Sequence, residues 1–335
     1  MTTSARSTAM GMADPHVEET IDLTLTRKLA RRGVVVHTNP SASDIQDRLT
    51  VFLGSRIQGE FRLTNLSRLP GGASKEQSSG VRDITLGDLL REGAATVPER
   101  IALVDGVADP DARKSWTYSQ LLVETERVAQ ALLTEFKPGD RIGIWAPNSA
   151  GWVVLQQAIA MAGMVVVAAN PAYRAHELEY VLKQSGAVAL FYRDSYRGTD
   201  LREILDEIRP RLPELRKAIS TQGWNSFVEA ADRTKELPAV SPTDPVQIQY
   251  TSGTTGFPKG ALLHHKGIVN EAKFVFERAG MEDGGVCVNA MPMYHIGGGA
   301  VTELGTFSSF GTYVVLPIGE QGEICCCHLP MEGVC

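Results

Sequence analysis

The chain has 335 residues, of which 43% are hydrophobic and 21% charged, and its formal net charge is −6. This balance is that of an ordinary globular protein, with enough apolar residues for one large domain or two smaller ones. A mildly acidic chain lacks the clustered Lys and Arg of a nucleic-acid-binding surface, so no nucleic-acid partner is expected. Any anionic ligand must therefore be held by a local group of residues.

Cysteine usage and hydropathy indicate a cytoplasmic protein. Four of the five cysteines lie in the last eleven residues, so no disulfide framework is expected to span the fold. Residues 1–13 lack the apolar segment of a signal peptide. The most apolar stretch, Ala150–Ala169, is interrupted by Gln156, Gln157 and Gly163, so no transmembrane segment is predicted.

Residues 1–80 show no repeating hydrophobic face. A short β-like fragment, Gly33–Val36, is surrounded by polar residues, and the segment ends in the Gly- and Ser-rich stretch Pro70–Gly80. Such composition is typical of extensions and linkers. We therefore expect residues 1–80 to be an extension and linker that precede the folded part of the chain.

From Ile84 onwards, strand-like and helical segments alternate. Thr85 is a candidate cap for a helix that ends near Pro98, and Ser119 is a candidate cap for the next helix. The predicted strands are Ile101–Val104, Trp116–Tyr118, Arg141–Trp145, Val165–Val167 and Ala187–Tyr192, and the later predicted helices include residues 121–132, 147–161, 176–185 and 201–208. This alternation implies parallel strands with helix-covered faces. We predict an α/β fold, with layered helices on mostly parallel sheets, over residues 81–317.

A Ser-, Thr- and Gly-rich loop between two strands carries the strongest chemical signal. It follows the alternating strand Val246–Tyr250 and precedes the strand-like Ala261–Leu263 and a helix that stops at Gly280. Its glycines let backbone N–H groups approach a phosphate, and its hydroxyls and lysine add donors and charge. The predicted phosphate-binding residues are Thr251, Ser252, Gly253, Thr254, Thr255, Gly256 and Lys259.

This loop differs from the Walker motif, in which Gly-Lys-Ser/Thr opens directly into a helix. Here Lys259 follows Pro258 and precedes Gly260, and a strand comes next. The alternative interpretation is a flexible surface linker. The position between two strands, with this order of residues, favours an anion-binding loop.

The segment Thr251–Gly260 reads Thr-Ser-Gly-Thr-Thr-Gly-Phe-Pro-Lys-Gly. It resembles the AMP-binding signature of the adenylate-forming superfamily of acyl-CoA synthetases, luciferases and peptide-synthetase adenylation domains. Further segments agree with this family in order and spacing, namely Trp116–Leu121, Asn170–Leu178, Gly260–Gly267 and Met291–His295. The Asn-Pro-x-Tyr segment and the Tyr-His pair before Gly297–Gly299 are most similar to those of fatty-acyl-CoA ligases. An aryl-CoA ligase and a peptide-synthetase adenylation domain are alternative interpretations.

The resemblance implies a two-step reaction. A fatty or other carboxylic acid and ATP give acyl-AMP and pyrophosphate, and CoA then displaces AMP, with Mg²⁺ as the metal. It further implies that Thr251–Lys259 hold the β- and γ-phosphates, that Ser252 reaches Mg²⁺, and that His295 is catalytic, beside the carboxylate. The alternative interpretation of His295 is a buried histidine at a strand end. His264 and His265 are expected to shape a turn.

After Pro317 the sequence departs from the family pattern. Residues 318–335 comprise a Gly-Glu-x-Gly-Glu-Ile segment, which lies much later in the family, and a Cys-rich tail. The N-terminal domain is therefore expected to be incomplete and the C-terminal domain absent. Consecutive cysteines fit zinc-ligand spacing poorly, so an altered reading frame is the favoured interpretation of the tail. Three hypotheses follow: an active fatty-acid–CoA ligase, an inactive nucleotide- or acyl-binding fragment, and a non-functional truncation product.

Overall fold

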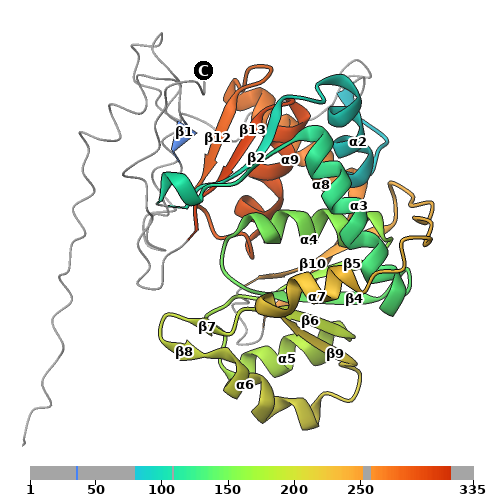
Figure 1. Ribbon diagram of the computed structural model, residues 1–335, viewed down its shortest axis with the longest axis vertical. Helices are drawn as coiled ribbons and strands as arrows, with labels where there is room; N and C mark the ends of the chain where they lie inside the picture. Colours follow the sequence, from blue (N-terminus) through green and yellow to red (C-terminus); the bar gives the residue numbers. More distant parts are fainter. Residues whose placement is uncertain (1–34, 37–79, 108, 252–257, 318–335) are drawn as a thin grey trace, which may run out of the picture.

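The computed structural model describes residues 35–36, 80–107, 109–251 and 258–317 (Figure 1). Within the predicted extension, two residues of the β-like fragment form strand β1 (Val35–Val36). The rest of the extension, residues 252–257 of the loop and the segment 318–335 lie outside the described residues. The expectations about those segments stay predictions.

Helices and strands alternate along the described chain. The helices are α2 (Leu86–Thr96), α3 (Tyr118–Glu135), α4 (Ala150–Met161), α5 (Ala175–Ser185), α6 (Leu201–Ile208), α7 (Trp224–Glu229), α8 (His265–Ala279) and α9 (Thr302–Ser308), with a π-helical turn at Gly297–Val301. The strands after β1 are β2 (Ile101–Asp105), β3 (Ser115–Thr117), β4 (Arg141–Trp145), β5 (Val165–Ala168), β6 (Ala189–Tyr192), β7 (Ser195–Tyr196), β8 (Thr199–Asp200), β9 (Lys217–Ser220), β10 (Pro245–Thr251), β11 (Lys259–His264), β12 (Val286–Asn289) and β13 (Thr312–Val315).

The strands form two large sheets, both mainly parallel. The order in the β12 sheet is β1-β12-β13-β2-β3, with β2 and β3 antiparallel and the other neighbours parallel. The order in the β10 sheet is β11-β10-β5-β4-β6-β9, with β10 and β11 antiparallel and the other neighbours parallel. The α/β fold with mostly parallel sheets is therefore confirmed for the described residues.

Helix α4 lies between the two sheets (Figure 1) and contacts β2 in one sheet and β5 in the other. Every residue of α4 except Gly151 is buried. A helix without a polar face belongs in a protein core or a membrane, and here the two sheets and helices α2 and α3 surround it. The apolar stretch Ala150–Ala169 thus comprises α4 and β5. No helix in the described part of the chain is long and apolar enough to cross a membrane.

Two helix starts illustrate how local sequence sets the boundaries. Thr85 caps α2 as predicted, in a capping box with Asp88. The cap of α3 is Thr117 and not Ser119, because the Thr117 hydroxyl accepts from the backbone N–H of Gln120 while the Gln120 side chain accepts from the N–H of Thr117. The predicted strand Trp116–Tyr118 is therefore one residue too long, and Tyr118 begins the helix.

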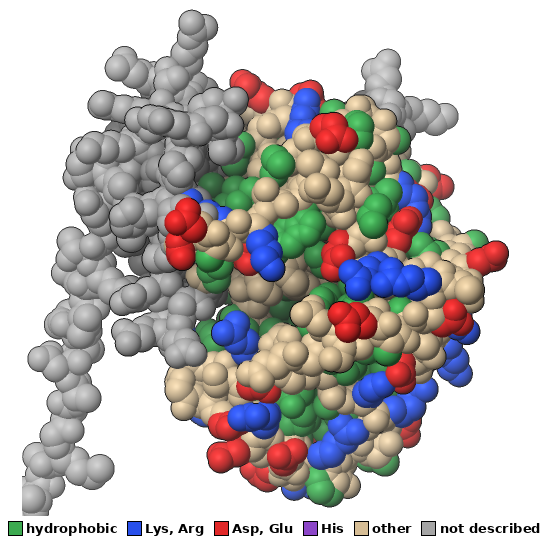
Figure 2. All heavy atoms as spheres, viewed as in Figure 1, with side chains coloured by type: hydrophobic (Ala, Val, Ile, Leu, Met, Phe, Trp, Pro, Cys, Tyr) green, Lys and Arg blue, Asp and Glu red, His purple; other side chains and the backbone are tan. Residues whose placement is uncertain are grey.

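Charged side chains of both signs are interspersed over the face shown in Figure 2. Ion pairs also join neighbouring elements: Glu179 of α5 accepts from Lys183 at 2.6 Å and from Arg211 at 2.8 Å. Exposed pairs of this kind contribute little to folding stability, so the fold depends mainly on its apolar core. The expectation that nucleic acid is not a partner stays a prediction.

The two consecutive histidines at the start of α8 both shape the chain there, as predicted. The His264 side chain caps the helix by accepting from the backbone N–H of Gly267 at 3.0 Å. His265 is 1% exposed, and its Nδ1 accepts from the N–H of Leu86 at 3.3 Å, which joins α8 to the start of α2. Its Nε2 has no hydrogen-bond partner among the described residues. Burial lowers the pKa of His265 to about 4.

We expect His265 to make the folded state sensitive to acid. Its pKa is about 4 in the folded state against 6.5 in an unfolded chain, so its contribution is present above pH 6.5 and is lost as the pH falls to 4. The loss is about 3 kcal/mol of unfolding free energy. Denaturant unfolding of the wild type and of His265→Asn at pH 4, 5.5 and 7 measures it. An equal pH dependence in both proteins contradicts the prediction.

Candidate active site

The signature loop joins β10 to β11 at the carboxyl end of β10. Thr251, the last residue of β10, is paired in register with Lys259, the first residue of β11, and both side chains are exposed. The other predicted phosphate-binding residues, Ser252 to Gly256, lie between this pair and outside the described residues. The structure therefore pairs the two end residues of the loop, and the Thr251 hydroxyl donates to the backbone carbonyl oxygen of Lys259 at 3.5 Å.

Helix α5 fixes both strands that support the loop. The Tyr180 hydroxyl donates to the carbonyl oxygen of Pro258 at 3.1 Å, next to Lys259. The Tyr250 hydroxyl lies 2.5 Å from Oε1 of Gln184 and 3.2 Å from the carbonyl oxygen of Val181. Burial raises the pKa of Tyr250 to about 12, so this phenol stays a hydrogen-bond donor at neutral pH. The supporting role of these two tyrosines was not predicted from the sequence, because aromatic residues in such positions are typical of an ordinary core.

Two amide side chains, one on β10 and one just after β4, hold the segment that carries His295. Gln249 of β10 is buried, and its Nε2 donates to the carbonyl oxygen of Tyr294 at 2.9 Å. Asn148, just after β4, donates to the carbonyl oxygen of Met291 and accepts from the N–H of Met293, both at 2.8 Å. The carboxyl ends of β4, β10 and β12 therefore meet. In open α/β sheets ligands bind outside the carboxyl ends of the strands.

His295 lies in a turn six residues after the end of β12, and its side chain is exposed. The alternative interpretation, a buried histidine at a strand end, is therefore wrong. Its Nδ1 accepts from the backbone N–H of Gly297 at 3.2 Å, and its carbonyl oxygen accepts from the N–H of Gly299 at 2.8 Å. When the ring is neutral, this bond places the proton on Nε2, which becomes the donor toward a ligand.

Glycine is required in the turn that follows His295. A Cβ atom at Gly299 would overlap the carbonyl oxygen of Met293, and one at Gly298 would overlap the backbone of Pro292. The chain here forms the π-helical turn, a local feature often found at functional sites. The close backbone approach explains the Gly-Gly-Gly run that the sequence shows after the Tyr-His pair.

We expect Gly299→Ala to displace the His295 turn. The new methyl group has to move backbone, not a flexible side chain, so the expected loss is about 3 kcal/mol of unfolding free energy, at the upper end of overpacking costs. Gly223→Ala is the matched control, because a Cβ there meets no atom within 4 Å. Thermal and denaturant unfolding of both variants measure the difference. Equal stability of the two variants contradicts the prediction.

A cation lies near the same segment at the tip of the β7–β8 hairpin. Arg197 and Gly198 have φ angles of +49° and +73°, so the hairpin is closed by a two-residue turn in the left-handed region. The Arg197 guanidinium lies 5.3 Å from the ring centroid of Tyr196. The pKa of Tyr294 is raised by burial and by Tyr196, and the Arg197 charge opposes this shift. The pattern Arg-Gly between short polar segments was too weak a signal to predict this hairpin.

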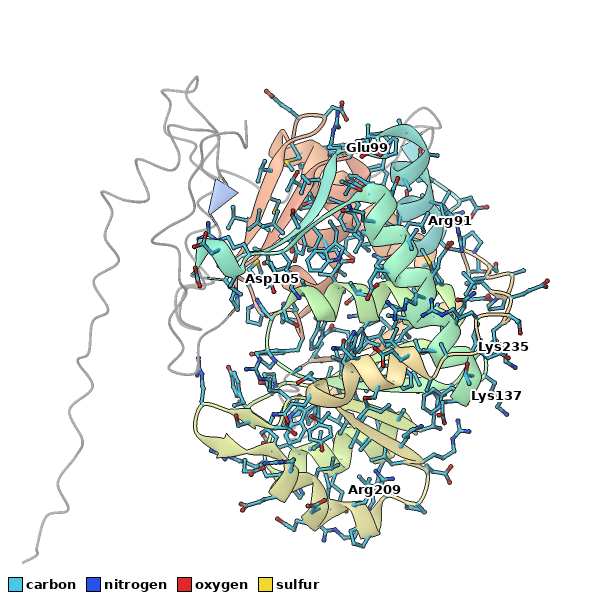
Figure 3. All side chains as sticks on the ribbon, in the orientation of Figure 1. Arg91, Glu99, Asp105, Lys137, Arg209 and Lys235 are labelled. Carbon is cyan, nitrogen blue, oxygen red and sulfur yellow. The ribbon has the colours of Figure 1, made fainter. Side chains whose placement is uncertain are left out.

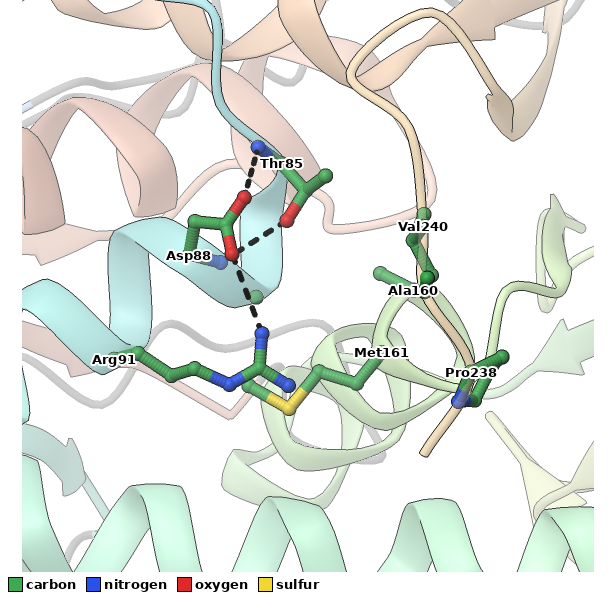
Figure 4. Close-up of a pocket in the computed structure, with 9 residues that line it drawn as sticks. Thr85, Asp88, Arg91, Ala160, Met161, Pro238 and Val240 are labelled. Atoms are coloured by element: carbon green, nitrogen blue, oxygen red, sulfur yellow. Dashed lines mark hydrogen bonds and ion pairs between the residues drawn. The ribbon is translucent and has the colours of Figure 1, made fainter. Parts of the chain in front are cut away.

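No group of three or more His, Cys, Asp or Glu side chains in the described part of the chain could hold a metal ion. A cavity of about 210 Å³ lies elsewhere, between the start of α2, the end of α4 and residues 238–240 (Figure 4). Its polar groups are engaged in the α2 cap, where Arg91 also donates to Asp88 at 3.3 Å. It contains none of the predicted site residues.

The fold and this arrangement define the class of protein. The model of the AMP-binding enzyme family matches residues 90–326, so the chain belongs to that family of adenylate-forming enzymes.

Individual relatives are acyl-CoA ligases. The medium-chain acyl-CoA ligase ACSF2, mitochondrial, of Homo sapiens is 38% identical over 258 residues, which cover 68% of this chain and 41% of the relative. A long-chain-fatty-acid-CoA ligase (FadD1) from Archaeoglobus fulgidus has a TM-score of 0.63 at 23% identity, over 70% of this chain and 47% of that chain. The N-terminal domain of FACL13 from Mycobacterium tuberculosis has a TM-score of 0.59 at 24% identity, over 69% and 56%. The chain spans about two fifths of the length of the human relative.

The fold class and the family resemblance are thus confirmed. The roles of the individual site residues stay predictions, and so does the cytoplasmic location, since the human relative is described as mitochondrial.

Proposed function

We propose that this chain carries the phosphate-binding part of an acyl-CoA ligase, which activates a fatty acid with ATP to acyl-AMP and then forms acyl-CoA. The observation that carries the proposal is the junction of the loop strands with the His295 segment, through the bond from Gln249 to the carbonyl oxygen of Tyr294. It brings the strand that precedes the candidate phosphate-binding loop and the segment of the candidate carboxylate-binding group, His295, to one edge of the fold. The name of the human relative supports a medium-chain acid as substrate.

Adenylation moves negative charge onto the leaving pyrophosphate. The hydroxyl of Thr251 and the ammonium of Lys259 flank the loop and suit the β- and γ-phosphates of ATP, because preorganised donors stabilise charge as it develops. Ser252 is the proposed contact to Mg²⁺. The hydrogen bond from the N–H of Gly297 to Nδ1 orients the His295 ring, so that its Nε2–H can donate to an oxygen of the acid.

Exchange of labelled pyrophosphate into ATP, dependent on added acid, tests the proposal. We expect exchange with octanoic or decanoic acid and background exchange without acid. ATP binding by calorimetry separates the competing hypothesis of an inactive binding fragment, which binds ATP but shows no exchange with any acid. Purified, cooperatively folded protein with no exchange would overturn the proposed activity, and absence of ATP binding as well would overturn the phosphate role of the loop.

A further inference from the structure

A buried carboxyl group lies one helical turn after the glycine turn and takes no part in the proposed chemistry. Glu303 of α9 is 0% exposed and faces α4. Its Oε1 accepts from Nε2 of Gln157 at 2.6 Å, and its Oε2 accepts from Nε2 of Gln156 at 3.3 Å. Both glutamines are buried at 1% exposure or less. Glutamate is almost never fully buried unless it is paired, and no cation acts on Glu303 in the described part of the chain, so this cluster requires an explanation.

The cluster is connected to the backbone that positions His295. Nε2 of Gln156 also donates to the carbonyl oxygen of Gly299 at 2.5 Å, and the N–H of Gly299 donates to the carbonyl oxygen of His295 at 2.8 Å. The amide of Gln156 has a defined orientation, because its Oε1 accepts from the indole Nε1 of Trp152 at 3.2 Å. Exchanging its oxygen and nitrogen would place two donors against each other.

We propose that Glu303 is a positioning residue that holds Gln156 and Gln157 of α4 and, through Gln156, the glycine turn that places His295. Unpaired amides are costly in an apolar interior, and Glu303 accepts from the NH2 groups of both glutamines, while Oε1 of Gln157 has no partner among the described residues. The link from Glu303 to the turn stands on these contacts alone. Its consequence for catalysis rests on the proposed function.

The charge state of Glu303 makes this link dependent on pH. The titratable groups that face it are neutral: the Tyr313 phenol of β13 interacts with it directly, and the buried Cys287 thiol of β12 interacts with Tyr313. The residues of α4 that contact it are amides, and the buried His265 of α8 interacts with other charges, those of Asp88, Asp244 and His264. Burial without a cation raises the pKa of Glu303 to about 8, although the bond from Gln157 opposes the shift.

A merely structural carboxyl would affect stability without affecting the His295 ring. The ring is followed by heteronuclear NMR on protein with labelled histidine, with the His295 signal assigned by its loss in His295→Asn. We compare the wild type, Glu303→Gln, which keeps the hydrogen-bonding shape, and Glu303→Leu, which removes it. Glu271→Leu on the exposed face of α8 is the control for the change of residue type.

The expected result is a His295 signal at the wild-type position in Glu303→Gln and at a new position in Glu303→Leu. Between pH 7 and 9.5 the wild-type signal should move in a way that Glu303→Gln does not reproduce. An unmoved signal in folded Glu303→Leu overturns the proposal. If that variant does not fold, the same pH response in the wild type and Glu303→Gln overturns it.

Kinetics give the second readout. In the exchange assay we expect Glu303→Leu to lower kcat by up to about 100-fold with the KM for ATP unchanged, because displacement of a catalytic group by about 1 Å can cost that much. Lowered kcat and raised KM in equal proportion would point to general damage and contradict a positioning role. Failure of the proposed function gives a different result: the wild type shows no pyrophosphate exchange, while the His295 signal still responds to the change at Glu303.

Discussion

Replacing Lys259 with alanine is expected to lower fatty-acid-dependent pyrophosphate exchange by about 100-fold or more, with the fold unchanged. Removal of a single preorganised donor from a site of developing charge costs this order of magnitude in kcat. Lys259 is exposed and begins β11 opposite Thr251. Its side chain therefore places a charge at the end of the loop and contributes little to the packing of the core. The KM for ATP should rise as well, because the proposed role also has the ammonium bind the phosphates of the nucleotide.

The control for Lys259→Ala is an exposed lysine far from the loop. Lys137, labelled in Figure 3, precedes β4 at the amino end of the sheet, whereas the site lies at the carboxyl ends. We expect Lys137→Ala to exchange at the wild-type rate. Lys259→Arg distinguishes charge from shape, because it keeps the charge but presents a planar fork in place of a point charge. Exchange by Lys259→Ala at the rate of Lys137→Ala would exclude a role for this lysine in binding phosphate.

The second large effect concerns stability at alkaline pH. The pKa of Glu303 is about 8 in the folded protein against 4.5 for a solvated carboxyl group. A raised folded-state pKa means that the contribution of Glu303 is fully present below pH 4.5 and is lost as the pH rises through 8. The total loss is on the order of 4 to 5 kcal/mol of unfolding free energy. Near pH 7 the slope is about 1.4 kcal/mol for each pH unit.

Glu303→Gln isolates this effect, because an amide of the same shape does not titrate. Denaturant unfolding at pH 5, 7 and 9 should show a wild type that loses stability relative to Glu303→Gln at each step. His265 acts in the opposite direction between pH 4.5 and 6.5, so the comparison with the variant, and not the wild-type curve alone, reports Glu303. A constant difference between the two proteins over this range would show that the carboxyl is not neutral in the folded state.

Several elements could be predicted from the sequence because local chemistry determines them. Thr85 and Gly280 mark helix ends by capping and by the left-handed conformation, which Gly280 adopts at φ +77°. The alternation of apolar strands and helices indicated parallel sheets. The error at Tyr118 also has a local cause. Thr117 and Ser119, two positions apart, can both cap a helix, and the capping box with Gln120 that selects Thr117 competes with the β propensity of the segment.

The site was only partly accessible to sequence reasoning. The loop ends Thr251 and Lys259 and the position of His295 follow from short motifs, whose residues are close in the chain. No short motif could reveal the roles of Asn148, Gln249 and Glu303, because their hydrogen-bond partners are 45 to 147 residues away in the chain. From its neighbours Thr302 and Leu304, Glu303 would be predicted to lie on the solvated face of a helix. No local pattern shows that α4 covers it.

The family and the α/β class could be identified from the sequence alone, and so could the candidate phosphate-binding residues, because glycines, hydroxyls and a lysine lie close together in one short segment. The contacts that support the loop strands became visible only in the folded structure. Parallel strands bring their carboxyl ends to one edge only after folding, and the buried amides that join β4, β10 and β12 there are recognisable only once their partners are in place. The same is true of Glu303: its proton affinity depends on burial, and burial is a property of the packed chain.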